Sequence, residues 1–259
     1  MKIEDWLTGH VQLFVLVFFR VLSLCLVAPI FGNRAVPAQI KAGLGFVTAL
    51  VLMPLVLQTQ PAQVHPWTAF PVLILQESSV GFVIGVVASL LFAAAQLSGE
   101  ILDRYMGFGL AHLIDPEFDE ETSLVSEFEN LVALMLFLAI GGHHILLLGL
   151  CESFELIPLG GVRCDSAIAM EIVRVTGQVF PVAIKLTAPA FVILIVTTVV
   201  EGLIARFVPQ MNVLVIGLPL KIAVGLIGLA ACVPMFSYIF DKMLRATTGD
   251  MYTMLEHLR

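Results

Sequence analysis

Long apolar segments dominate this chain and restrict what it can fold into. Each of the six is about 18 residues or longer, enough α-helix to cross a hydrocarbon core of roughly 30 Å. No strand-like alternation of polar and apolar residues accompanies them. The pattern predicts an all-α, membrane-type protein. The segments are Val11–Phe31, Ile40–Leu57, Phe70–Leu97, Leu131–Leu150, Val179–Val208 and Val213–Phe240.

Composition agrees with a membrane-type protein and argues against a soluble enzyme. Apolar residues make up 59% of the 259 residues, and charged residues make up 13%. So little polar surface cannot cover so much apolar volume in water. The net charge of −7 argues against a basic surface that would bind nucleic acid. The four cysteines show no CxxC spacing, so we expect buried thiols and neither disulfides nor a zinc site.

Charged side chains and prolines inside the apolar segments indicate that these helices are not simple lipid-facing spans. Each charge near the centre of a lone spanning helix costs about 2.5–3.5 kcal/mol. A proline removes a backbone donor, which membrane depth tolerates only against protein or a water-filled cavity. Kinked or broken helices within a larger assembly accommodate both features. The charges are Arg20, Glu77, Lys185, Glu201 and Lys221, and the prolines are Pro54, Pro71, Pro181, Pro189, Pro219 and Pro234.

The third apolar segment carries a glycine spacing typical of closely packed helices. Gly81 and Gly85 form a GxxxG motif. Small residues at this spacing let the backbone of a second helix approach closely. We therefore predict that this part of the segment packs against another helix.

Almost all of the net charge lies in one polar connection, about residues 100–129. It holds nine acidic residues against one basic residue, Arg104, a balance of −8 that leaves +1 for the rest of the chain. A run of like charges is most often a solvated loop. However, residues 105–112 read Tyr-Met-Gly-Phe-Gly-Leu-Ala-His. This apolar, glycine-spaced stretch is unlike a plain solvated loop.

No motif for catalysis or cofactor binding stands out. The chain has no phosphate-binding glycine motif, no HExxH and no GxSxG. The nearest metal candidate is the pair His143 and His144, but adjacent side chains on a helix point about 100° apart. We predict a turn-like break at Gly141-Gly-His-His144 and no catalytic, cofactor-binding or metal-binding residues. A membrane enzyme using the two histidines remains an alternative that metal analysis would test.

Two adjacent motifs late in the chain resemble the signature of the FliR family. They read Ala205-Arg-Phe-Val-Pro-Gln-Met-Asn212 and Ile216-Gly-Leu-Pro-Leu-Lys-Ile222. Tyr105 departs from the pattern, since the family often has Gln before Met-Gly. Further matches follow the family's order over roughly residues 10–245: Arg20 before Ala28-Pro-Ile-Phe-Gly32, Gly99-Glu100 with Met106-Gly107, Asp115-Pro116, Gly141-Gly-His-His144, and Phe154 before Pro158-Leu-Gly160.

The resemblance implies a non-enzymatic subunit of a type III protein-export gate in the bacterial inner membrane, at the flagellar basal body. Such a subunit assembles with FliP-like and FliQ-like subunits, and we expect an FlhB-like subunit as well, into a channel for unfolded proteins. It resembles a FliP-like N-terminal part fused to a FliQ-like C-terminal part within one domain, 1–259. The Gly-Phe-Gly-Leu-Ala-His and Gly-Gly-His-His matches favour the flagellar system over an injectisome. A secondary transporter remains an alternative, because broken helices and intramembrane charges are expected there too.

The family also places a plug loop inside the pore, and this loop maps here to residues 106–116. We predict that it occludes the closed pore and moves during export, with an ordinary helix-connecting loop as the alternative. Glycine permits backbone conformations closed to other residues. Deformable apolar side chains can close a lumen, and an apolar constriction blocks ions by dewetting. The predicted gate residues are Met106, Gly107, Phe108, Gly109, Leu110, Ala111, His112, Asp115 and Pro116.

A second predicted set consists of charged residues at buried positions or subunit interfaces. We expect them to pair between helices or between subunits and so to fix register, and a proton pathway is the alternative role. The set is Arg20, Glu77, Lys185, Arg206 and Lys221.

Overall fold

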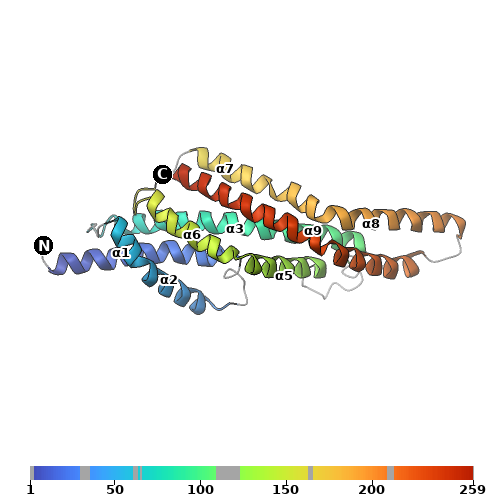
Figure 1. Cartoon of the computed structure of the whole chain (residues 1–259), viewed down its shortest axis with the longest axis horizontal. Coiled ribbons are helices and arrows are strands. Elements are labelled where there is room, and N and C mark those ends of the chain that lie inside the picture. Colours follow the sequence, from blue (N-terminus) through green and yellow to red (C-terminus); the bar gives the residue numbers. More distant parts are fainter. Residues whose placement is uncertain are drawn as a thin grey trace. The chain divides into compact units, whose positions relative to one another are not determined.

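The computed structural model describes residues 3–29, 36–60, 64, 66–108, 123–162, 166–208 and 213–258. Within these ranges the chain is helical and has no strand (Figure 1), so the all-α prediction is confirmed. The helices are α1 (Ile3–Val27), α2 (Ala38–Thr59), α3 (Phe70–Met106), α5 (Leu124–Ala139), α6 (Gly142–Leu156), α7 (Ser166–Gly177), α8 (Val179–Phe207) and α9 (Val213–Leu258).

Five helical segments of the described chain are long and apolar enough to cross a membrane. The pair α5 and α6 makes a sixth candidate when it is taken as one span. The prediction of a multi-pass membrane protein is therefore confirmed. The five segments are Leu7–Val27, Ala38–Thr59, Phe70–Met106, Ile168–Phe207 and Ile216–Leu258.

The predicted break at the Gly-Gly-His-His motif is also confirmed. Helix α5 ends at Ala139 and α6 begins at Gly142, so the predicted run Leu131–Leu150 is two helices instead of one. Gly141, the N-cap of α6, has φ 80°. This left-handed conformation suits glycine because a Cβ atom would clash with the backbone there.

The prolines do not end the helices that contain them. Pro54 lies inside α2, Pro189 inside α8, and both Pro219 and Pro234 inside α9. Each of these four leaves one carbonyl of the preceding turn without its helical donor. Packing against other protein compensates for such a loss better than lipid does, which agrees with helices built for an assembly.

The chain divides into two compact units that interleave along the sequence. Unit 1 comprises residues 1–90, 141–176 and 244–259, and unit 2 comprises residues 91–140 and 177–243. Helices α3 and α9 contribute to both units. Each unit therefore takes material from both the N-terminal and the C-terminal half of the chain.

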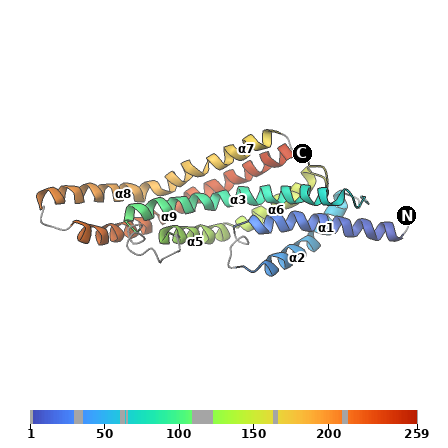
Figure 2. The same cartoon turned by 180° about the vertical axis from the view of Figure 1, so that it is seen from behind.

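In unit 1 the GxxxG glycines let α3 approach α1, as predicted, and Figure 2 shows the two helices side by side as Figure 1 does. A Cβ atom built on Gly81 would lie 2.0 Å from the carbonyl oxygen of Arg20. One built on Gly85 would lie 2.8 Å from the Cβ atom of Val27. Only glycine leaves room for this approach, which brings α3 close enough for its side chains to pair with those of α1.

Candidate functional site

The predicted plug begins at the C-terminal end of α3, in unit 2. The amides of Gly107 and Phe108 both donate to the carbonyl of Asp103, at 3.1 and 3.2 Å. Gly107 has φ 91°, a left-handed conformation that ends the helix at this point. Of the predicted gate residues the structure describes Met106, Gly107 and Phe108, whereas Gly109, Leu110, Ala111, His112, Asp115 and Pro116 lie outside the described residues.

Met106 anchors the start of this segment. It is fully buried in a core cluster of unit 2 that takes residues from α3, α5, α8 and α9. A Cβ atom on Gly225 of α9 would lie 2.6 Å from the Met106 Cγ, so a larger residue there would force the Met106 side chain to move. Met106 therefore fixes the C-terminal end of α3, and Phe108 is the first bulky side chain after it. The cluster contains Leu102, Met106, Val125, Ala190, Leu194 and Leu229, with Phe108, Phe191 and Cys232 packed against it.

The start of α5 is fastened to the C-terminal part of α3. The Asp103 carboxylate accepts a hydrogen bond from the Val125 amide at 3.4 Å. The Ser126 hydroxyl donates to a backbone carbonyl of α3 at 3.0 Å. A Cβ atom on Gly99 would lie 2.3 Å from the Ser126 Cα, so α5 crosses α3 in direct backbone contact. Contacts from α3 thus hold the start of α5 in place. We call these contacts the loop clamp.

Tyr105, the departure from the family pattern, lies on the surface of unit 2 next to this clamp. Its ring meets the Phe191 ring edge-on at 4.6 Å between centroids. With Ile101 and Arg104 these two aromatic residues line an open hollow of about 470 Å³. The phenol at this position therefore packs on α8 and leaves the Arg104 side chain exposed.

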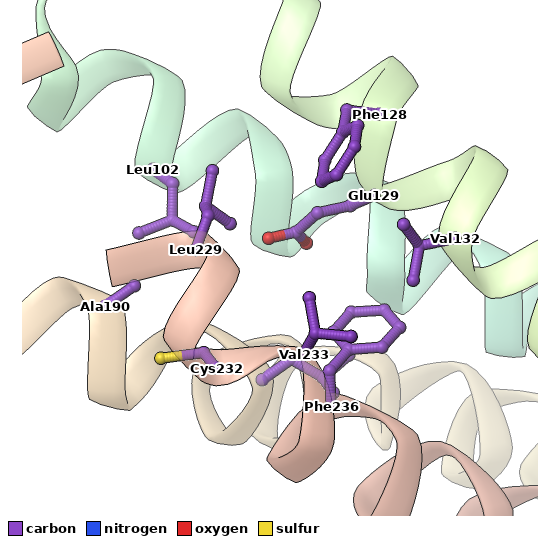
Figure 3. A pocket seen from close by; sticks show the side chains of 10 residues that line it. Leu102, Phe128, Glu129, Val132, Ala190, Leu229, Cys232, Val233 and Phe236 are labelled. Atoms are coloured by element: carbon purple, nitrogen blue, oxygen red, sulfur yellow. The ribbon is translucent and has the colours of Figure 1, made fainter. Parts of the chain in front are cut away.

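A second, smaller pocket of unit 2 contains an acidic side chain. Its cavity volume is about 20 Å³, which is room for a single water molecule. The Glu129 side chain is 4% exposed and its carboxyl group points into the pocket (Figure 3). One of its oxygens, Oε2, has no hydrogen-bond partner in the described part of the chain. The pocket is lined by Leu102, Phe128, Glu129, Val132, Leu186, Ala190, Leu229, Cys232, Val233 and Phe236.

Unit 2 also holds one ion pair of the predicted charge set. The Lys221 Nζ of α9 lies 3.3 Å from the Glu201 Oε2 of α8, and the two side chains are 25% and 10% exposed. Lys185 and Arg206 are exposed on α8. The prediction that these two side chains contact other subunits therefore stays a prediction.

In unit 1, Arg20 and Glu77 form a completely buried ion pair. The Arg20 Nε donates to the Glu77 Oε2 at 2.6 Å, and both side chains are 0% exposed. The remaining guanidinium donors reach α6 and its end, with bonds to the Ser153 carbonyl at 2.9 Å and the Ile157 carbonyl at 3.2 Å. The Phe154 ring stacks on the guanidinium at 4.3 Å. One side chain thereby joins α1, α3 and α6.

The turn after α6 is fixed by side chains of two other helices. The Glu77 Oε1 accepts a hydrogen bond from the Gly160 amide at 2.8 Å. The Gln60 amide group, at the end of α2, donates to the Phe154 carbonyl at 2.7 Å and accepts from the Leu159 amide at 2.8 Å. These bonds satisfy backbone groups at a helix end that would otherwise be unpaired in an apolar environment.

The histidine pair does not form part of a larger ligand cluster in the described residues. The centroids of the His143 and His144 rings lie 4.2 Å apart. No group of three or more metal-ligating side chains occurs in the ranges that the structure describes. The features of the described chain that bear on the predicted sites are the loop clamp, the Arg20–Glu77 and Lys221–Glu201 ion pairs and the buried Glu129 carboxyl.

Sequence reasoning missed the individual roles of Asp103 and Glu129. Both were counted only as members of the acidic connection. A signal for Glu129 was nevertheless present, because it lies four residues after Val125 and four before Ala133, on the buried stripe of α5. An acid on the apolar stripe of a helix must point into protein. The sequence held no comparable signal for Asp103. Its partner is the backbone amide of Val125 at the start of α5, and a backbone amide leaves no mark in the sequence.

The chain resembles known export proteins over nearly its whole length. Residues 11–247 match the family described as bacterial export proteins, family 1. The flagellar biosynthetic protein FliR of Bacillus subtilis (strain 168) is 32% identical over 245 residues, which cover 93% of this chain and 94% of that protein. The proteins of the same name from Pectobacterium carotovorum and Escherichia coli (strain K12) are each 30% identical, with coverages of 98% and 98%, and of 93% and 94%.

Proposed function

Since the chain belongs to the FliR family of bacterial export proteins, we propose that it is a subunit of the flagellar type III protein-export gate. In this proposal it lies in the inner membrane at the flagellar basal body. It joins FliP-like and FliQ-like subunits, and an FlhB-like subunit, in a channel that passes unfolded proteins. The observation that carries the proposal is the family match over residues 11–247. The flagellar names of all three relatives favour the flagellar system over an injectisome.

The surface of α8 supports a role in assembly. A stripe of large apolar side chains is exposed along it at helical spacing, at Val192, Val196, Val199 and Leu203. Two exposed cations, Lys185 and Arg206, lie on the same helix. A purely lipid-facing helix disfavours such charges. Contact with other subunits would accept both the apolar stripe and the cations.

Co-expression with the FliP-like and FliQ-like subunits of the same organism tests this proposal. We expect native mass spectrometry of the purified particle to find a discrete complex with one copy of this chain. The physical reason is that the exposed apolar surface needs protein partners as well as lipid. A stable particle of this chain alone, with no partner retained, would contradict the proposal. Substrate-uptake assays would then test the secondary transporter.

Within the gate, we propose that the segment starting at Phe108 occludes the closed pore. Support comes from the helices on either side, because Met106 is buried at the end of α3 and the loop clamp joins α3 to the start of α5. In this proposal the segment moves during export. The domain arrangement follows the family, with a FliP-like N-terminal part, a FliQ-like C-terminal part and the plug in the acidic connection of about residues 100–129.

Deleting residues 107–111 should raise ion conductance through the closed complex several-fold. The deletion removes Phe108 and the apolar residues that follow it but keeps Met106 and every residue of the loop clamp. Conductance is measured on the purified complex in planar lipid bilayers. Native mass spectrometry of the same sample serves as the control for assembly. A complex that assembles and conducts like the parent would overturn the gate proposal.

A further inference from the structure

The open hollow near the C-terminal end of α3 has no role in the export-gate proposal. It belongs to unit 2 and has a volume of about 470 Å³, within the range of ligand-binding pockets. Ile101, Tyr105 and Phe191 give it apolar or aromatic walls, and Arg104 adds one positive charge. Such a lining fits a ligand that has an apolar part and a negatively charged group.

The place of the hollow on α3 is typical of a helix end at the level of lipid headgroups. Arg104 lies in the last turn of α3, and the apolar segment Phe70–Met106 is long enough to cross a membrane. Arginine at such an end extends its charge to the headgroups while its methylene groups stay on apolar surface. Tyrosine is enriched at the same level, and Tyr105 is 47% exposed. A phospholipid is therefore the ligand that fits this place.

Two charges of opposite sign lie one helical turn apart beside the hollow. Glu100 precedes Arg104 by four residues on α3, so their Cβ atoms are about 5–6 Å apart on one face of the helix. Neither side chain forms an ion pair within the described part of the chain. The Glu100 carboxyl accepts a long hydrogen bond of 3.4 Å from the Gln96 amide group. A phosphate pairs with Arg104 but is repelled by Glu100, whereas a headgroup that carries both a phosphate and an ammonium group satisfies both charges.

The apolar surface of the hollow continues along both helices, away from the end of α3. Leu97 lies one turn before the hollow on α3 and is half-buried. Ile184 lies two turns before the hollow on α8 and is 61% exposed. The Thr187 hydroxyl donates to the Ser98 hydroxyl at 3.1 Å on the same side of the hollow, so the two helices run in the same direction here. Acyl chains that enter the hollow thus find apolar side chains along both helices.

We propose that the hollow between α3 and α8 binds a phospholipid whose headgroup carries both a phosphate and an ammonium group. The phosphate pairs with Arg104 and the ammonium group with Glu100, and the acyl chains lie against Ile101 and Phe191. This site needs neither the plug nor a partner subunit. It is therefore independent of the export-gate proposal.

Native mass spectrometry of the full-length chain in a mild detergent tests the site. The chain is supplied with equal amounts of phosphatidylethanolamine and phosphatidylglycerol, and we expect it to retain phosphatidylethanolamine. Arg104→Gln should lower the retained phospholipid several-fold, because the phosphate loses its partner. Glu100→Gln should shift retention toward phosphatidylglycerol. Lys242→Gln is the matched control and should change neither result, since Lys242 is an exposed cation of unit 2 that does not line the hollow.

The competition in the parent chain requires no variant, so it tests the headgroup even if a variant folds poorly. A parent that retains phosphatidylglycerol instead would refute the role of Glu100. Equal retention by the parent and a folded Arg104→Gln variant would overturn the site. So would an Arg104→Gln variant that keeps its lipid but loses FliP-like or FliQ-like subunits, since the hollow would then be a protein interface. Failure of the parent to form any complex would refute the proposed function and leave the lipid result standing.

Discussion

Replacing Arg20 with methionine should prevent the stable folding of unit 1. The substitution leaves the Glu77 carboxylate fully buried without its cation, and it removes the bonds to the Ser153 and Ile157 carbonyls. Breaking a buried pair by removing one partner costs about 3–5 kcal/mol. That is a large part of the roughly 5–15 kcal/mol by which a folded domain is stable. The yield of folded chain in detergent and its unfolding temperature measure the effect.

A double variant separates the cost of leaving the Glu77 carboxylate unpaired from the cost of changing how the side chains pack. Arg20→Met combined with Glu77→Met removes both charges, and replacing a buried ion pair with apolar residues is often neutral or stabilising. We expect the double variant to recover much of the folded yield that Arg20→Met loses. A single variant as stable as the parent would show that the ion pair does not hold α1, α3 and α6 together.

Replacing Gly99 with alanine should disrupt the crossing of α3 and α5. The new methyl group would lie 2.3 Å from the Ser126 Cα and 2.7 Å from the Ser126 amide nitrogen. Both are backbone atoms, so no side chain can turn aside to make room. The helices must separate, and the loop clamp through Val125 and Ser126 is lost with them. We expect the free energy of unfolding to fall by about 1–3 kcal/mol or more, as in other overpacked cores.

The same change at Gly202 of α8 provides the matched control. Nothing lies within 4 Å of a Cβ atom there, and the residue is inside a helix. Alanine should therefore be neutral or stabilise unit 2 by up to about 1 kcal/mol through helix propensity. Thermal unfolding compares the stability of the two variants. Equal unfolding temperatures for both variants would contradict the close crossing of α3 and α5.

The helices of this protein could be predicted from the sequence because their causes are local. Apolar runs of about 18 residues or more form helices in or near a membrane wherever they occur in the chain. The glycine spacing at Gly81 and Gly85 indicated a close helix contact, since the absence of a side chain needs no knowledge of the partner. The break at Gly141 was predictable for the same reason. What these patterns lack is any information about which helix packs against which.

The positions of the charged residues show where sequence reasoning ends. The cost of a charge in an apolar segment required partners for Arg20 and Lys221, and the structure provides Glu77 and Glu201. The same argument applied equally to Lys185, which is exposed on α8. Judged by residue type, placing the Lys185 charge in an apolar segment costs as much free energy as placing those of Arg20 and Lys221 there. The surroundings of Lys185, however, depend on neighbours that a single sequence does not specify.

The sequence by itself determined the all-α membrane class and the family, because these depend on residue type and order. Only the tertiary structure decided that Met106 is an anchor, that Asp103 fastens the start of α5, and that Glu129 points into a pocket. Each of these depends on contacts between helices far apart in the chain. Such contacts are set by the joint packing of α3, α5, α8 and α9, which no local pattern encodes.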